Sequence, residues 1–251
     1  MTKLTSRLCC LLCVLSQNVN AEEALIAVAT NFFNSAKQIE SSFERSTQHQ
    51  VTLVSGSTGK LYAQIRHGAP FDAFLAADQE RPRLLEGSPF GVRNSRFTFA
   101  IGQLALASAS PEVIKADAQE SLRQRPNGPF AIANPALAPY GDASRKALQS
   151  LQQWSALEGD IVLGESVGQT FAMVATGNVQ LGIVALSQAM NPGHSNAVSY
   201  VRISTLLHES IRQDAVLLSH GKDNLAAREF LKFLRVEVTQ AFLLDSGYGV
   251  E

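Results

Sequence analysis

Small polar residues and glycine follow strand-like segments at four places in this chain, and a helix is predicted to begin at each of them. The residues at these four helix starts are Thr30 and Asn31, Ser57 and Thr58, Tyr140, and Ser166 and Val167. The first turn of a helix has backbone N–H groups without intrahelical acceptors, and the helix dipole adds partial positive charge. One interpretation is that these residues cap the helices and bind no ligand. Their recurrence at four places favours a binding site for an anion.

The four segments contain many hydroxyl and N–H groups and few charged side chains. Asp142 and Glu165 are the nearest acids, and their positions suit them as partners of a helix dipole. Lys60 is expected to lie on a solvated helix face. A bare cation would need converging carboxylates, which the four segments lack. We therefore predict no metal-ion site and no cofactor, and an anion held by uncharged donors.

Common signatures of hydrolytic and phosphate-transfer sites are absent from the sequence. It contains no G-x-S-x-G elbow and no H-E-x-x-H motif, and the string GSTGK at 56–60 lacks the four-residue spacer of a phosphate-binding P-loop. None of the histidines lies beside a candidate nucleophile in the sequence. We predict a binding protein and not an enzyme, with a secreted α/β hydrolase as the less favoured alternative.

Residues 1–21 differ from the remainder of the chain. Lys3 and Arg7 precede an apolar run at 8–15, and 19–21 has the small-residue pattern of a signal-peptidase site. We predict a cleaved signal peptide, and thus a location in the cell envelope or outside the cell. All three cysteines lie in this leader, so no disulfide is expected in the mature protein.

The net charge of the chain argues against nucleic acid as a partner. The formal charge is −1, and it becomes −3 once Lys3 and Arg7 leave with the leader. Nucleic-acid binding requires a basic face that neutralises phosphates. Attraction of a small anion would therefore come from local dipoles and not from the overall field.

Strand-like and helical segments alternate along the mature chain, which predicts the α/β class with parallel sheets and helices on both faces. Long strands near residues 100 and 215 would cross twice between two lobes. The predicted lobes are 22–100 plus 210–251, and 101–209. A ligand would bind in the cleft between them, at the carboxyl ends of the strands. One helix is predicted over 143–157.

Five segments resemble the periplasmic molybdate-binding proteins of ABC importers, and the similarity covers essentially the whole mature chain. The segments are VATNFFNSAKQIESSFE (28–44), VSGSTGKLYAQIRHGAPFDAFLAAD (54–78), NPALAPYGDASRKAL (134–148), ESVGQTFAMV (165–174) and LGIVALSQA (181–189). The resemblance implies the two-lobed, type II solute-binding fold. It also implies that neutral hydroxyl and main-chain N–H groups hold a tetrahedral oxyanion.

The resemblance places particular residues at the oxyanion. They are Thr30, Asn31, Thr58, and, through their main-chain N–H groups, Tyr140 and Val167. Ser57 would exchange with Thr58 if the register shifted by one residue. Ala185 departs from the family pattern, because many members have a tyrosine there and use its hydroxyl. Thr30 with Asn31 is expected to replace that donor.

The function that the resemblance implies is an extracytoplasmic receptor for molybdate or tungstate. The protein would act in the periplasm as a monomer and deliver the anion to an ABC transporter permease in the inner membrane. Molybdate and tungstate are nearly equal in size, so either satisfies the prediction. The alternative within the same fold is a receptor for sulfate, thiosulfate or phosphate.

Overall fold

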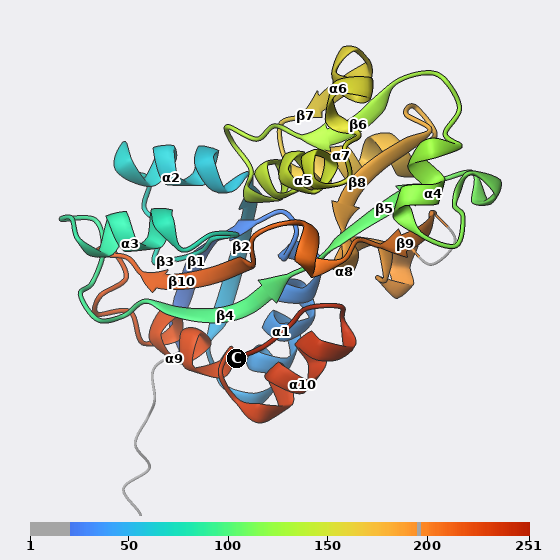
Figure 1. Cartoon of the computed structure of the whole chain (residues 1–251). Coiled ribbons are helices and arrows are strands. Elements are labelled where there is room, and N and C mark those ends of the chain that lie inside the picture. Colours follow the sequence, from blue (N-terminus) through green and yellow to red (C-terminus); the bar gives the residue numbers. More distant parts are fainter. Residues whose placement is uncertain (1–20, 195–196) are drawn as a thin grey trace, which may run out of the picture.

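A computed structural model describes residues 21–194 and 197–251, which form two five-stranded sheets covered by helices (Figure 1). The predicted signal peptide and the cysteines lie outside the described residues, except for Ala21 at the end of the leader. No helix in the described ranges is long and apolar enough to cross a membrane.

The first sheet has the strand order β2-β1-β3-β10-β4. Its strands are β1 (Glu23–Ala29), β2 (Gln50–Gly56), β3 (Ala73–Leu75), β4 (Phe97–Gly102) and β10 (Ile211–Leu217). Its helices are α1 (Phe33–Ser46), α2 (Thr58–Arg66), α3 (Glu80–Glu86), α9 (Leu225–Phe233) and α10 (Glu237–Asp245). Figure 1 shows α2 and α3 on one face of this sheet and α1, α9 and α10 on the other.

The second sheet has the strand order β7-β6-β8-β5-β9. Its strands are β5 (Leu104–Ser108), β6 (Phe130–Ala133), β7 (Ile161–Gly164), β8 (Leu181–Ala185) and β9 (Ser199–Arg202). Its α-helices are α4 (Ala118–Arg123), α5 (Pro139–Ser150), α6 (Trp154–Leu157), α7 (Val167–Ala175) and α8 (Leu186–Ala189). Short 3-10 helices occupy Pro111–Val113, Glu158–Asp160, Pro192–His194 and Thr205–Leu207. Helix α5 contributes to one apolar cluster; α7 contributes Val167 to the same cluster, and Phe171 and Val174 to a second one.

The predicted α/β class with helices on both faces is confirmed, but the sheets are mixed and not purely parallel. Strands β1, β2 and β3 pair in parallel, as do β6, β7 and β8. Strands β10 and β5 pair antiparallel with their neighbours. The reason is that β4 and β5 form a nearly continuous segment that leaves the first sheet and enters the second, and β10 returns (Figure 1). The lobe limits 22–100 plus 210–251, and 101–209, remain a prediction.

The prediction of one helix over 143–157 is wrong, because the structure has two helices there with a break between them. Helix α5 ends at Ser150 and α6 begins only at Trp154. Between them, Gln152 adopts a left-handed backbone conformation with φ of 56°. That conformation is uncommon outside glycine and interrupts a right-handed helix. Strand β9 was also not predicted, because its short, alternately half-buried sequence has no strong apolar signal.

Helix α1 is anchored by an apolar stripe whose members are spaced three or four residues apart. Ala36, Ile39 and Phe43 are buried in the core of the first sheet, and so is Phe32 at the helix start. The Phe32 ring centroid lies 4.6 Å from that of Phe99 on β4 and 5.5 Å from that of Tyr248. These contacts fix the turn at the end of β1, where Thr30 and Asn31 lie.

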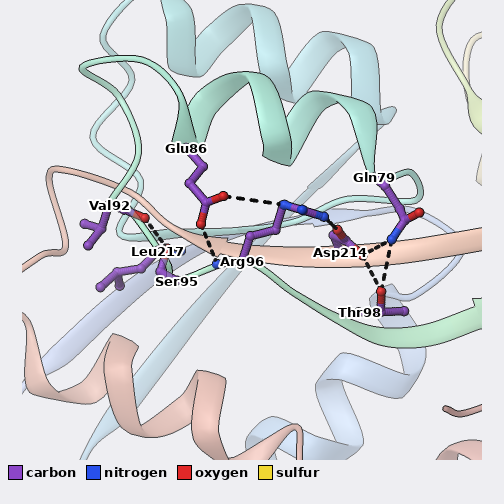
Figure 2. Close-up of polar contacts among 8 residues, drawn as sticks. All are labelled: Gln79, Glu86, Val92, Ser95, Arg96, Thr98, Asp214 and Leu217. Carbon is purple, nitrogen blue, oxygen red and sulfur yellow. Dashed lines mark hydrogen bonds and ion pairs between the residues drawn. The ribbon is translucent and has the colours of Figure 1, made fainter.

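A buried carboxylate joins the two crossing strands of the first sheet (Figure 2). Asp214 on β10 is fully buried and forms an ion pair with Arg96. Its Oδ1 accepts hydrogen bonds from the Thr98 hydroxyl at 2.8 Å and from Gln79 Nε2 at 3.2 Å. The β10–β4 register shifts between Gln213 and Asp214. The carboxylate therefore holds β10 against β4 at the position where their register shifts.

Replacing Arg96 by leucine should lower stability, because Asp214 would stay buried without its counter-charge. We expect Arg96→Leu to reduce the unfolding free energy by about 3 kcal/mol, or roughly 6–12 °C in melting temperature. Thermal unfolding checks this. Arg93→Leu is the matched control: Arg93 is exposed and has no ion pair within the described ranges, so a change below about 0.5 kcal/mol is expected. An Arg96→Leu protein as stable as the control would contradict this account.

Candidate functional site

The four predicted helix starts meet around one small cavity of about 10 Å³, about the size of a single water-sized sphere. The residues that line it are Ala29, Thr30, Asn31, Ser57, Thr58, Ala77, Ala138, Pro139, Tyr140 and Val167. The structure thus brings together all five residues that the resemblance places at the oxyanion, from the turn after β1 and from the starts of α2, α5 and α7. Ser57 also lines the cavity, whereas Ser166 does not. Their role as ligands remains a prediction. None of the ten lining residues carries a charged side chain.

Backbone N–H groups are the main donors at the cavity. Thr58 and Val167 are the first residues of α2 and α7, and Tyr140 is the second residue of α5 after Pro139. Asn31 lies in the turn before α1, which begins two residues later. In the part of the chain that the structure describes, none of these four N–H groups has a hydrogen-bond acceptor. Four uncommitted donors at one cavity are an arrangement with the chemistry to hold an anion.

The hydroxyl groups at the cavity have different local roles. The Ser57 hydroxyl caps α2 by accepting from the Lys60 N–H. The Thr58 hydroxyl accepts from the Ala77 N–H at 3.1 Å, and the Thr30 hydroxyl accepts from the Gly168 N–H at 3.2 Å. A hydroxyl that accepts one hydrogen bond can still donate its own hydrogen. The threonine hydroxyls are thus held in place by backbone donors while keeping a hydrogen to give.

A buried network of three neutral side chains lies beside the cavity. Asn31 Nδ2 donates to Gln213 Oε1 at 2.8 Å and to the Tyr140 hydroxyl at 3.3 Å. Gln213 Nε2 also donates to the Tyr140 hydroxyl, at 3.3 Å. Asn31, Tyr140 and Gln213 are 2%, 1% and 0% exposed. Burial raises the pKa of Tyr140 well above its usual value, so the phenol stays neutral at physiological pH.

Gln213, Ser187 and Tyr248 also support the cavity lining and were not among the predicted site residues. The Tyr248 hydroxyl donates to the Asn31 carbonyl at 2.8 Å, and the Ser187 hydroxyl does so at 3.4 Å. Gln213 was missed because it follows the charged residue Arg212, although it lies close to the centre of the crossing strand predicted near residue 215. A glutamine next to an aspartate in such a strand is the available signal, because buried polar side chains require partners.

Hydrogen bonds between the part of the chain around the first sheet and the part around the second sheet lie next to the cavity. The Gly59 N–H of α2 donates to the Leu137 carbonyl at 3.0 Å, just before α5. The Gly168 N–H of α7 donates to Thr30, as described above. At the rim, Lys60 and Glu165 form an exposed ion pair at 2.5 Å. Lys60 is therefore paired at the surface and does not line the cavity.

A larger cavity of about 360 Å³ lies nearby, but its charge does not suit an anion. It shares Ala77 and Pro139 with the small cavity. Its charged lining residues are Asp78, Glu80, Asp142, Glu209, Lys146 and Arg212. Acids outnumber bases, and Lys146 is already paired with Asp142 and Glu209. In residues 21–194 and 197–251, no three His, Cys, Asp or Glu side chains are grouped to hold a metal ion.

Comparison with known protein families gives one match that spans nearly the whole described chain. Residues 24–249 match the family described as bacterial extracellular solute-binding proteins. The family model covers all of the segments that form the cavity, on both sides of it.

Individual relatives agree with this match. The chain is 42% identical over 231 residues to the molybdate-binding protein ModA of Azotobacter vinelandii, covering 92% of this chain and 91% of the relative. It is 38% identical to the molybdate-binding protein ModA of Rhodobacter capsulatus, covering 92% and 90%. Among solved structures, the periplasmic molybdate-binding protein of Azotobacter vinelandii superposes with a TM-score of 0.86 at 33% identity, covering 91% of this chain and 99% of that one.

Proposed function

Because this chain belongs to the family of bacterial extracellular solute-binding proteins, we propose that it is an extracytoplasmic receptor for molybdate or tungstate. The relatives named as molybdate-binding proteins match it over about nine-tenths of their length. The observation that carries the proposal is the cavity itself: four N–H groups that have no acceptor among residues 21–194 and 197–251 lie at a space with no charged lining residue.

Neutral donors suit a fully deprotonated tetrahedral dianion. Such an ion has acceptor oxygens on all sides and no hydrogen to donate. Hydrogen phosphate carries a proton and favours a site with an acceptor carboxylate, which is absent from the ten lining residues. Sulfate and thiosulfate have the same charge pattern as molybdate. Selection against them would rest on the size of the cavity, since the donor groups would be shared.

The cavity also argues against the hydrolase alternative. Its lining residues include no histidine, cysteine, aspartate, glutamate or lysine. General acid–base catalysis needs a titratable group within hydrogen-bond reach of the reacting atoms. Tyr140 is the one titratable side chain in the lining, and its raised pKa leaves it a poor base at neutral pH. Binding without turnover is the chemistry that this site supports.

We extend the proposal to the cellular role. The receptor would act in the periplasm after removal of residues 1–21, bind the anion as a monomer, and pass it to the permease of an ABC transporter in the inner membrane. The crossing segments β4–β5 and β10 would act as the hinge for opening. The contacts of Gly59 and Gly168 across the cavity would break when the two sides separate.

Thermal unfolding with a panel of anions tests the function. An anion at one hundred times its Kd stabilises the folded protein by about 2.7 kcal/mol, or roughly 5–10 °C for a chain of this size. Molybdate and tungstate at micromolar concentration should raise the melting temperature, whereas sulfate and phosphate should not. Equal melting temperatures with all four anions would refute the proposal.

Val167→Pro should weaken anion binding strongly, because it removes one N–H donor without changing charge. Proline is well tolerated at the first position of a helix, and Ser166 has the extended backbone that a following proline requires (φ −147°, ψ 162°). Calorimetric titration should show at least a tenfold loss of affinity, the cost of about 1.4 kcal/mol.

The matched control is Glu237→Pro. Glu237 is the exposed first residue of α10, it follows the extended residue Val236, and it lies away from the cavity. The control should keep the affinity of the unsubstituted protein. Unchanged affinity in Val167→Pro would mean that the N terminus of α7 does not bind the anion.

A further inference from the structure

The hydrogen-bond network beside the cavity leaves one buried atom unsatisfied. Asn31 Oδ1 has no hydrogen-bond partner, although Asn31 is 2% exposed. Its Nδ2 is turned to Gln213 and Tyr140, and the residue lines the cavity. A buried acceptor without a donor costs about 1–3 kcal/mol. A fully deprotonated oxyanion has no hydrogen to offer, so this arrangement does not suit the ligand of the proposed function.

The same network leaves donors unused as well. The Tyr140 hydroxyl accepts from both Asn31 and Gln213, and its own hydrogen has no acceptor among the described residues. The Gln213 amide nitrogen has a second hydrogen, which also has no acceptor among the described residues. An unsatisfied acceptor and two unsatisfied donors within three buried side chains indicate that a second arrangement of the same groups is available.

A half-turn of the two amide groups provides that arrangement. Amide nitrogen and oxygen have nearly the same size, so the exchange hardly changes the shape of the network. Gln213 Nε2 then donates to Asn31 Oδ1 across the 2.8 Å contact. The Tyr140 hydroxyl donates to Asn31 Oδ1 or to Gln213 Oε1 across a 3.3 Å contact. What remains is the Asn31 NH₂ group, turned away from both partners.

We propose that Gln213 is the positioning residue that sets which end of the Asn31 amide faces the anion. With an oxyanion bound, Gln213 donates to Asn31 Oδ1, and Asn31 Nδ2 donates to the anion. The inference rests on the proposed function. Gln213 acts through Asn31 and is not a lining residue of the cavity. Asp214, fixed by Arg96 and Thr98, holds the adjacent residue of β10 in place.

This arrangement also gives the site a means of choosing between anions. With Asn31 Oδ1 facing the cavity, the site would accept a hydrogen bond from a protonated oxyanion such as hydrogen phosphate. With Nδ2 facing the cavity, every group around the anion is a donor. Gln213 thereby favours the dianion without placing a charge near it.

Two substitutions with opposite chemistry test the proposal by calorimetric titration with molybdate. Gln213→Met keeps the length of the side chain and removes both hydrogen-bonding groups, so about a tenfold loss of affinity is expected at every pH. Gln213→Glu introduces a group that, when ionised, only accepts. It would hold Asn31 Nδ2 away from the anion and add a like charge, with about a hundredfold loss at about pH 8.

Comparison of the two variants at low pH distinguishes positioning from packing and from charge, because a protonated Gln213→Glu that orients Asn31 should bind more tightly than the equally neutral Gln213→Met. Burial raises the pKa of an introduced carboxyl group, and the protonated form can donate to Asn31 Oδ1 as Gln213 does. The affinity of Gln213→Glu, relative to the unsubstituted protein at the same pH, should therefore recover as the pH falls from about 8.5 to about 5.5. Gln240→Met is the matched control. Gln240 donates to the Phe99 and Leu234 carbonyls away from the cavity, and its loss should leave affinity unchanged.

Each result decides one question. If the unsubstituted protein binds neither molybdate nor tungstate, the proposed function fails; if it binds tungstate alone, the variants are titrated with tungstate. If it binds, and Gln213→Met binds equally well or the loss in Gln213→Glu is the same at all pH values, the role of Gln213 is refuted. Neutron diffraction from the unsubstituted protein with bound anion needs no variant. It should show deuterium on the Asn31 atom nearest the anion, and a bare oxygen there would overturn the proposal.

Discussion

The proposed function depends on one constraint: a small cavity lined only by uncharged residues would have to satisfy an anion with N–H and O–H groups alone. Helix starts provide this because their first N–H groups have no acceptors inside the helix. Three helices, α2, α5 and α7, and the turn before α1 direct such groups to one point. Charged side chains remain at the rim, where Lys60 pairs with Glu165. The binding energy would therefore come from many fixed dipoles, which cost little reorganisation when the ion enters.

The remainder of the fold holds these helix starts in register. The cavity lies where the two sheets approach each other, so its geometry depends on the segments that cross between them. The ion pair of Arg96 with Asp214 joins β10 to β4 beside a register shift, and the next residue, Gln213, reaches Asn31 and Tyr140. Tyr248 closes the other side by donating to the Asn31 carbonyl. Loss of any of these supports would displace a hydrogen-bond donor at the cavity and would leave the charge of the cavity lining unchanged.

Local sequence patterns predicted the elements and most of the cavity lining, because strand ends and helix starts are encoded within a few residues. The stripe of Phe32, Ala36, Ile39 and Phe43 is an example, and all four are buried. Contacts between segments that are distant in the sequence have no local pattern from which they could be predicted. Gln213 meets Asn31 across 182 positions and Tyr248 meets it across 217. The helix break at Gln152 was missed because no glycine or proline marks it.

The most direct measurement is a crystal structure of the protein with tungstate, in which anomalous scattering locates the tungsten atom. The account predicts one strong peak in the cavity between Asn31, Thr58, Tyr140 and Val167, with the oxygens in contact with backbone N–H groups and hydroxyls. A peak outside this cavity, or a peak surrounded by lysine and arginine side chains, would contradict it.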